Sequence, residues 1–557
     1  MIRALKHIDA EGWSSIRARC VAVAVGMVFV LVTFRASMVA MGAAPEPRRA
    51  VSAAVKAEKR AEIQDRKGEL LAGSLAFDSL AANPRAMWDA EDVAKGLLTV
   101  FPDMDHEHLT ALLSDRRREF VWLRRKVSPR ERQAVYALGM EGLEFRREVQ
   151  RIYPAGSLAG HLIGYANIDL KGIAGVEYGF NDQLTEGAEP LRLTIDSGVQ
   201  YALEDELQFA AGAFDIKGGA GVVIEAKTGA VRAIASWPAL DPNTPADSDE
   251  TARLNRAIGA VYELGSVFKP LTIASALDAG VLHPADVFDV SEPLHIGTMV
   301  VKDDHPIEGD KASVTDVIAH SSNIGTVKIA ELVGERRQRA FLQELGLLDK
   351  PDIAYPGVAH PLLPAEWTPI ASATISYGHG LAVSPLSLAH AYTAFANNGE
   401  MPPLHIVEPD PFDEVVPQRV MSAPTARVVT EMMRKVVTEG TGQRADVYGY
   451  EVAGKTGTAE KPIPGGYAAD RNMTTFAAIF PASRPEYVVL ITLDEPLARP
   501  GEGRSAAFNA APVAGRLIAR IAPMLGVSPV FRDEKELIDD KSSLRGEMRS
   551  VSDRREL

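Results

Sequence analysis

A serine and a lysine three residues apart place the strongest constraint on this chain. Ser266-Val267-Phe268-Lys269 is the one S-x-x-K sequence among its 557 residues. Gly265 permits a tight turn just before the serine, and the apolar run 271–277 predicts a helix after it. Residues three apart on a helix share a face, so the lysine amine would lie beside the serine hydroxyl. Serine becomes a strong nucleophile when a neighbouring base takes its proton, and lysine is such a base when burial or another cation lowers its pKa.

Two further short motifs follow the serine in a fixed order. Ser321-Ser322-Asn323 is an S-x-N sequence that precedes the helix-like segment 324–333, and Lys455-Thr456-Gly457-Thr458 lies between strand-like segments. A second K-T-G, Lys227-Thr228-Gly229, precedes the serine and is better explained as the turn of a β-hairpin. The order S-x-x-K, S-x-N, K-T-G is typical of class A β-lactamases and penicillin-binding proteins.

The same region also matches a phosphate-binding loop. Residues 449–456 fit the pattern G-x-x-x-x-G-K-[ST]. Such a loop requires a strand before it and a helix after it, with the helix N-terminus directed at the phosphate. No apolar strand precedes residue 449, and the glycines and prolines of segment 457–466 prevent a helix. The context therefore excludes a nucleotide hydrolase.

Composition excludes several other classes of protein. The formal net charge is −14, whereas a nucleic-acid-binding protein usually carries a basic surface. The single cysteine, Cys20, rules out an intrachain disulfide and a multi-cysteine metal site. His106-Glu107-His108 lacks the H-E-x-x-H spacing that places two ligands on one helix face. We expect no metal and no cofactor.

The distribution of apolar residues predicts an anchor and two domains. Residues 20–34 are apolar and uncharged, and this character resumes over 36–41 beyond Arg35, so we expect a transmembrane helix over 20–41 after a cytoplasmic segment 1–19. A cleaved signal peptide and a buried core helix are the alternatives. A new strand pattern begins at Gly219, which predicts an N-terminal domain over 45–211 and a second domain over 212–525. The charged tail, 526–557, is expected to be disordered.

Beyond the three motifs, the chain resembles the class B penicillin-binding proteins, and within them the division-specific, FtsI-like type. Three segments carry this resemblance: Arg60 to Gly68, Arg151 to Gly156, and Ser376 to Pro385. The chain departs from the family pattern at Ala61, where glycine is usual, and around the nucleophile, where the family has E-P-G-S-T-x-K-P. The latter differences are Leu264 and Val267, which leave Ser266 and Lys269 unchanged.

The resemblance implies a fold and a place in the cell. The expected fold is α+β: a penicillin-binding, serine-transpeptidase fold with an antiparallel sheet flanked by helices, on an elongated N-terminal pedestal of the penicillin-binding protein dimerisation type. One transmembrane helix would hold it in the bacterial inner membrane, with the catalytic domain in the periplasm at the division site. The implied activity is that of a penicillin-sensitive peptidoglycan D,D-transpeptidase, which cross-links stem peptides of the septal wall through an acyl-serine.

The resemblance also implies catalytic roles. Ser266 would attack the penultimate D-alanine carbonyl of a stem pentapeptide, with Lys269 as its base. Ser321 would pass a proton towards the leaving amine. Lys455 would supply positive potential, which lowers the pKa of Lys269 and attracts the substrate carboxylate.

Further residues would bind the substrate. Asn323 would hold the amide backbone of the donor peptide, and the hydroxyls of Thr456 and Thr458 would bind its carboxylate. The intervening Gly457 belongs to the same binding segment. The backbone N–H groups of Ser266 and Thr458 would form the oxyanion hole.

Several alternatives share the acyl-serine and stay open on sequence alone. These are an elongation-type transpeptidase, a D,D-carboxypeptidase, a β-lactamase and a non-enzymatic β-lactam-binding sensor. A β-lactamase needs a glutamate that activates the deacylating water, and no motif assigns one here. The expected partners are stem peptides, β-lactams as inhibitors, a membrane glycosyltransferase of the FtsW type and other division proteins.

Overall fold

The computed structural model describes residues 20–33, 60–187, 189–307, 309–410, 415–463 and 465–531. The chain divides into two units, residues 1–59 and 60–557. In the first unit, residues 20–33 form a helix. No helix among the described residues is both long and apolar enough to cross a membrane. Segments 1–19 and 34–41, and all of the predicted tail from residue 532 onward, lie outside the described residues.

A mixed sheet with a small helical cap forms the N-terminal part of the second unit. Strand β2 (Leu70–Ala82) is its centre and pairs antiparallel with both β3 (Val121–Val127) and β4 (Leu143–Ile152). The short β1 (Ile63–Gln64) lies between β2 and β5 (Leu191–Arg192) in this sheet. It pairs antiparallel with β2 and parallel with β5. The cap consists of η1 (Pro84–Ala86), α3 (Ala90–Val100), α4 (His106–Ser114) and α5 (Pro129–Ala137). A capping box at Ser128 and Glu131 starts the last of these helices.

A buried ionic cluster ties the start of this unit to its glycine-rich segment. Glu177, on α7 (Gly175–Gly179), is fully buried and accepts from Arg60 Nε at 2.5 Å and from Arg151 Nε at 2.6 Å. A buried carboxylate is tolerated when it is paired in this way, so loss of either arginine would leave a costly charge. Two of the segments that carry the family resemblance thus meet at one carboxylate. The neighbouring helices are α6 (Gly160–Ile163) and α8 (Asn181–Glu186).

The C-terminal part is built on a five-stranded antiparallel sheet in the order β14-β15-β16-β6-β7. Its strands are β6 (Gly218–Glu225), β7 (Val231–Trp237), β14 (Ala453–Ile463), β15 (Gly466–Phe480) and β16 (Tyr487–Asp494). The predicted hairpin around Lys227-Thr228-Gly229 is present, because this segment links β6 to β7 and Gly229 has a φ of +77°. The antiparallel sheet expected from the family resemblance is therefore confirmed.

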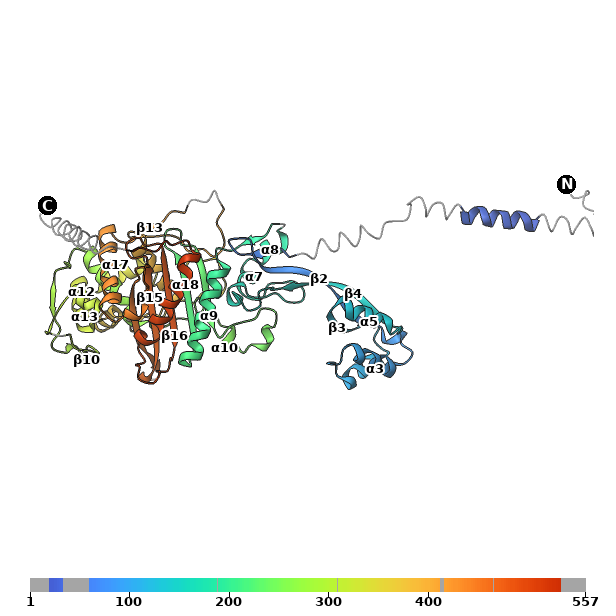
Figure 1. The fold of residues 1–557 in the computed structure, drawn as a ribbon, viewed down its shortest axis with the longest axis horizontal. Coiled ribbons are helices and arrows are strands. Elements are labelled where there is room, and N and C mark those ends of the chain that lie inside the picture. Colours follow the sequence, from blue (N-terminus) through green and yellow to red (C-terminus); the bar gives the residue numbers. More distant parts are fainter. Residues whose placement is uncertain are drawn as a thin grey trace, which may run out of the picture. The chain divides into compact units, whose positions relative to one another are not determined.

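Helices cover both faces of this sheet. Side chains alternate along a strand, so Val222 and Ile224 of β6 enter one hydrophobic core while Val223 enters another. The second core contains α9 (Ser197–Phe214) and α18 (Ala510–Met524), which pack on each other. The first contains α11 (Lys269–Asp278), α16 (Pro385–Ala396) and α17 (Ala423–Thr438). Figure 1 shows α18 and α9 beside β15 and β16. Helix α9 lies almost entirely before the predicted boundary at residue 212, yet it packs against β7.

The remaining elements lie around these two cores. They are η2 (Pro245–Asp247), α10 (Glu250–Arg253), η3 (Gly265–Phe268), β8 (Val287–Asp289), β9 (Leu294–Ile296), β10 (Met299–Val301), β11 (Lys311–Ser313), α12 (Val314–Ala319), α13 (Asn323–Val333), α14 (Glu335–Glu344), α15 (Pro369–Ser376), β12 (Glu400–Met401), β13 (Gln418–Arg419), η4 (Gln443–Ala445) and η5 (Ala506–Phe508).

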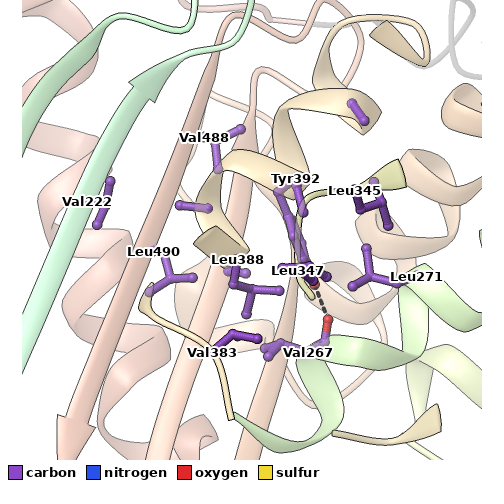
Figure 2. Close-up of a cluster of buried hydrophobic side chains, with 14 of the residues drawn as sticks. Val222, Val267, Leu271, Leu345, Leu347, Val383, Leu388, Tyr392, Val488 and Leu490 are labelled. Atoms are coloured by element: carbon purple, nitrogen blue, oxygen red, sulfur yellow. Dashed lines mark hydrogen bonds between the residues drawn. The ribbon is translucent and has the colours of Figure 1, made fainter. Parts of the chain in front are cut away.

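One buried hydroxyl links the first core to the turn that carries Ser266. Tyr392, on α16, is fully buried and its hydroxyl donates to the Val267 carbonyl at 2.7 Å. Figure 2 shows this hydrogen bond with Leu271, Leu347 and Leu388 around it. A carbonyl in this environment has no access to water, so the tyrosine satisfies it and fixes the backbone next to the serine.

We expect Tyr392→Phe to lower the free energy of unfolding by about 1–2 kcal/mol, because the Val267 carbonyl would stay buried without a donor. Urea unfolding followed by circular dichroism measures this change. Tyr136→Phe is the control, since Tyr136 is 62% exposed and should change stability little. Equal stability of Tyr392→Phe and the wild type would contradict the assigned role of the hydroxyl.

Candidate active site

The turn that carries Ser266 is a 3-10 turn that continues directly into a helix. Ser266 lies in η3, and α11 begins at Lys269 with Pro270 in its first turn. Gly265 has a φ of +66°, a conformation that favours glycine. The expected turn and helix are thus both present. Ser266 is partly exposed, whereas Lys269 is fully buried.

The other two motifs converge on this lysine. Lys269 Nζ donates to Ser321 Oγ at 3.0 Å, to the Ser321 carbonyl at 2.5 Å and to Asn323 Oδ1 at 2.8 Å. From the sheet, Lys455 Nζ donates to the same Ser321 Oγ at 3.0 Å and to the Thr456 carbonyl at 2.9 Å. One hydroxyl therefore lies between the Nζ atoms of two lysines from separate parts of the chain.

Both lysines are held in conditions that disfavour a proton. Burial lowers the pKa of the Lys269 ammonium to about 7, against the opposing effect of the Asp303 and Asp304 carboxylates. Burial, and then the positive charge of Lys269, lowers the pKa of Lys455 well below its usual range. Because both nitrogens contact one oxygen, they lie within about 6 Å of each other, close enough that a proton on one amine disfavours a proton on the other.

Backbone strain marks the serine between them. Ser321 has a φ of +62°, which is uncommon for a residue with a side chain. It lies between α12 and α13, and Ser322 caps α13 by accepting from Gly325 N at 2.9 Å. Strained residues of this kind persist where the surrounding structure fixes them, and they gather at functional sites.

The sequence patterns did not indicate the residue that fixes this loop, Asp303. Its carboxylate accepts from Ser322 Oγ at 2.7 Å and from the backbone N–H groups of Asn323 and Ile324 at 2.5 and 3.0 Å. It therefore holds the S-x-N segment at the N-terminus of α13, where a negative charge is stabilised. The acidic pair 303–304 follows a short hairpin and matches none of the three motifs, so no local signal connects it with residues 321–323.

The K-T-G segment lies in the edge strand β14, closely packed against η3. A Cβ added at Gly457 would lie 2.3 Å from the Leu264 carbonyl oxygen, and one added at Gly265 would lie 2.8 Å from the Thr458 carbonyl oxygen. Strand and turn can approach this closely only through glycines. Thr456 Oγ1 lies 2.7 Å from Thr441 Oγ1, and Thr458 Oγ1 accepts from Ala506 N at 3.1 Å.

We expect Gly457→Ala to slow acylation of Ser266 by about tenfold or more, because the new methyl group would push β14 away from the serine turn. The rate of labelling by a fluorescent penicillin measures this effect. Gly212→Ala is the matched control: Gly212 lies in a helix, an added Cβ there would meet nothing within 4 Å, and labelling should be normal. Normal labelling of Gly457→Ala would contradict the close-packing argument.

The structure also rules out the alternative that residues 449–456 form a phosphate-binding loop. Residues 453–463 form strand β14 and continue through a hairpin into β15, so no helix follows Lys455. The N–H groups of a helix N-terminus, which bind phosphate in such loops, are absent at this point of the described chain. The exclusion made from the glycines and prolines is confirmed.

Comparison with known proteins agrees with this geometry. Residues 219–518 match the family model of the penicillin-binding protein transpeptidase domain, and residues 55–212 match that of the penicillin-binding protein dimerisation domain. The chain is 40% identical over 486 residues to a probable peptidoglycan D,D-transpeptidase FtsI of Caulobacter vibrioides, covering 84% of this chain and 82% of that protein. It is 30% identical over 503 residues to the peptidoglycan D,D-transpeptidase FtsI of Escherichia coli K12, covering 84% of each.

A solved structure leads to the same group. The chain superimposes on penicillin-binding protein 3 of Mycobacterium tuberculosis, crystallised with aztreonam, with a TM-score of 0.65 and 26% identity, covering 85% of this chain and 97% of the other. The two matched domains, in this order on one chain, together with the FtsI relatives, show that the chain belongs to the class B penicillin-binding proteins.

Proposed function

We propose that this chain is a division-specific peptidoglycan D,D-transpeptidase that cross-links stem peptides of the septal wall through an acyl-serine. The observation that carries this proposal is the convergence of two buried lysines on Ser321 Oγ, next to the turn that presents Ser266. Such an arrangement supplies a base of lowered pKa and a proton relay beside the turn that carries the nucleophile. The FtsI-type relatives favour the septal role over an elongation role.

Acylation begins at Ser266. Neutral Lys269 takes the hydroxyl proton, and Ser266 Oγ attacks the penultimate D-alanine carbonyl. Donors preorganised towards the developing oxyanion stabilise the tetrahedral intermediate, and we assign them to the backbone N–H groups of Ser266 and Thr458. Ser321, within hydrogen-bond distance of both lysines, passes the proton to the leaving D-alanine nitrogen.

The sheet edge binds the donor peptide. The terminal carboxylate, once bound, stabilises the protonated form of Lys455, and the hydroxyls of Thr456 and Thr458 donate to the same carboxylate. Gly457 keeps this strand against the serine turn, and Asn323 holds the peptide amide. An amine of a second stem peptide then takes the acyl group and restores Ser266. The step needs no nucleotide or metal, since the energy comes from the D-alanyl-D-alanine amide bond that is exchanged.

We infer further that the chain is anchored in the inner membrane with residues 60–531 in the periplasm. The support is the apolar run that begins at Cys20 and resumes over 36–41. We also infer the domain division at about residue 212, and contacts of the anchor and pedestal with an FtsW-type glycosyltransferase and other division proteins. β-Lactams would acylate the same serine.

Products separate this proposal from its alternatives. Purified protein incubated with a stem pentapeptide donor and an amine-bearing acceptor peptide should give a cross-linked dimer and free D-alanine, detected by mass spectrometry. A carboxypeptidase would give only the shortened free acid. A sensor would give a stable adduct without turnover, and a β-lactamase would hydrolyse penicillin rapidly. Any of these three results would contradict transpeptidation.

A further inference from the structure

Two polar atoms beside the serine turn are buried with no hydrogen-bond partner. They are Glu263 Oε2 and His379 Nδ1, which are among eight such side-chain atoms in the described part of the chain. Native proteins satisfy nearly all buried polar atoms, so each of these two atoms marks a place where water or another molecule supplies the missing partner. None of the steps assigned above uses either residue.

One side chain, Tyr467, contacts both residues. Its hydroxyl donates to Glu263 Oε1 at 3.3 Å, and its ring lies edge-on to the His379 ring at a centroid distance of 5.8 Å. Tyr467 is 44% exposed and lies at the tip of the β14–β15 hairpin, opposite Pro462. A half-exposed side chain held by one long hydrogen bond moves aside at low cost. Tyr467 therefore lies against both side chains and can move away from them.

Glu263, His379 and Tyr467 form a group that lies against the turn that carries Ser266. Glu263 precedes Ser266 by three residues, and η3 packs against both β14 and β15. Gly378, the neighbour of His379, accepts from Gly265 N at 3.1 Å. In the register of the hairpin, Tyr467 pairs with Pro462, four residues beyond Thr458 and six beyond Thr456. The group thus lies towards the hairpin tip, and the Lys455–Thr456 end of the strand lies the other way.

The chemistry of the group suits an amine. Burial raises the pKa of Glu263, opposed by the Gly380 N–H and the Tyr467 hydroxyl, so that its carboxylate is a stronger base than an exposed one. Burial and the Lys269 charge lower the pKa of His379 to about 4, against a hydrogen bond with the Tyr377 backbone and the Asp304 charge. The imidazole is therefore neutral, with one nitrogen able to accept. A primary ammonium carries three donors and a positive charge, which match one carboxylate oxygen and one imidazole nitrogen.

We propose that Glu263 and His379, once Tyr467 moves away, bind the amine of the acceptor stem peptide, and that Glu263 takes its proton for attack on the acyl-serine. This inference rests on the transpeptidase function proposed above. It gives the active site two ends of opposite character, a cationic end for the donor carboxylate and an anionic end for the acceptor ammonium.

The protons balance in this step. The acceptor ammonium gives one proton to the Glu263 carboxylate, and its freed lone pair attacks the acyl carbonyl. The new C–N bond forms and the bond from the carbonyl carbon to Ser266 Oγ breaks. A second proton of the amine passes through the Lys269 and Ser321 relay to Ser266 Oγ, and the third stays on the new amide. Glu263 then releases its proton to solvent.

The test separates acylation from transfer. The full-length protein receives a D-alanyl thioester donor, with glycine amide or hydroxylamine as acceptor, and mass spectrometry counts amide, hydroxamate and free acid. We expect Glu263→Gln to lower transfer to glycine amide by about 100-fold, the usual contribution of a general base. Hydroxylamine is already neutral near neutral pH, so its transfer should fall only a few-fold. Hydrolysis and penicillin labelling, which do not use the acceptor amine, should change by about twofold at most.

Controls make each outcome decisive. Glu460→Gln makes the same charge change at an exposed position of β14 and should leave the ratio of amide to free acid unchanged. His379→Phe keeps a ring against Tyr467 but removes Nδ1, and should raise the KM for glycine amide while penicillin labelling persists. Unchanged transfer to glycine amide in both variants, or an equal loss with hydroxylamine, would overturn the proposal. If penicillin does not label the Glu263→Gln variant, the KM of the His379→Phe variant for glycine amide decides whether the proposal stands. Failure of the wild type to acylate at all would instead refute the transpeptidase function.

Discussion

Replacing Ser266 with alanine is expected to abolish covalent labelling by a fluorescent penicillin. The acyl-enzyme needs an oxygen nucleophile at this position, and loss of the nucleophile in serine enzymes lowers the rate by about a millionfold. Peptide mapping of the labelled wild type should find one adduct, on the peptide that contains residues 263–270. Folding should persist, because the partly exposed Ser266 side chain fills no core position.

A matched variant separates loss of the nucleophile from loss of structure. Ser197→Ala removes another hydroxyl, at the start of α9, and should label at the wild-type rate. Circular dichroism of both variants checks the fold. Labelling of folded Ser266→Ala at the wild-type rate, or an adduct on another residue of the wild type, would refute the assignment of the nucleophile.

Replacing Lys455 with methionine should slow acylation by about 1000-fold near neutral pH, even though Lys269 is intact. Two charges about 6 Å apart at an effective dielectric constant of about 20 interact by about 3 kcal/mol, which is about a hundredfold in proton affinity. Removing the Lys455 charge therefore raises the pKa of Lys269 and leaves less of the neutral base. Loss of the charged hydrogen bond to the donor carboxylate adds about another tenfold.

The pH profile of acylation tests this coupling directly. Lys269 must be neutral to act as the base, so the wild-type rate should rise as pH increases through the lowered pKa of about 7. In Lys455→Met the same rise should occur at higher pH, because the amine holds its proton more tightly without a neighbouring cation. Lys461→Met, farther along β14 and paired with Asp494 and Glu495, is the control and should keep the wild-type profile. An unshifted profile in Lys455→Met would show that the two lysines are not coupled.

Several structural expectations followed from local patterns because their causes are local. Gly265 before Ser266 and the apolar run after it predicted a turn and a helix, and η3 and α11 are found there. Lys227-Thr228-Gly229 between two apolar runs predicted the β6–β7 hairpin. Glycines and prolines after Lys455 excluded a helix, and β14 and β15 follow. In each case, the allowed backbone angles of a few neighbouring residues decide the outcome.

The residues that position the active site could not be predicted from local sequence patterns. Asp303 accepts hydrogen bonds from residues 19 to 21 positions later in the chain, a separation that matches no sequence motif. Tyr392 fixes the Val267 carbonyl from a helix more than a hundred residues later. A buried donor is recognised as such only when the acceptor that needs it is known, and that acceptor is brought near by the fold.

The identity and order of the three motifs follow from the residues alone, and with them the class of fold and the family. The folded chain was needed to show that Lys269 and Lys455 share one hydroxyl and are both fully buried, and that Glu263 and His379 each have an unsatisfied buried atom. The physical reason is that pKa values and hydrogen-bond satisfaction depend on burial and on distances of a few ångströms. Both are set by the packing of α11 against α13 and of β14 against η3, which no single segment specifies.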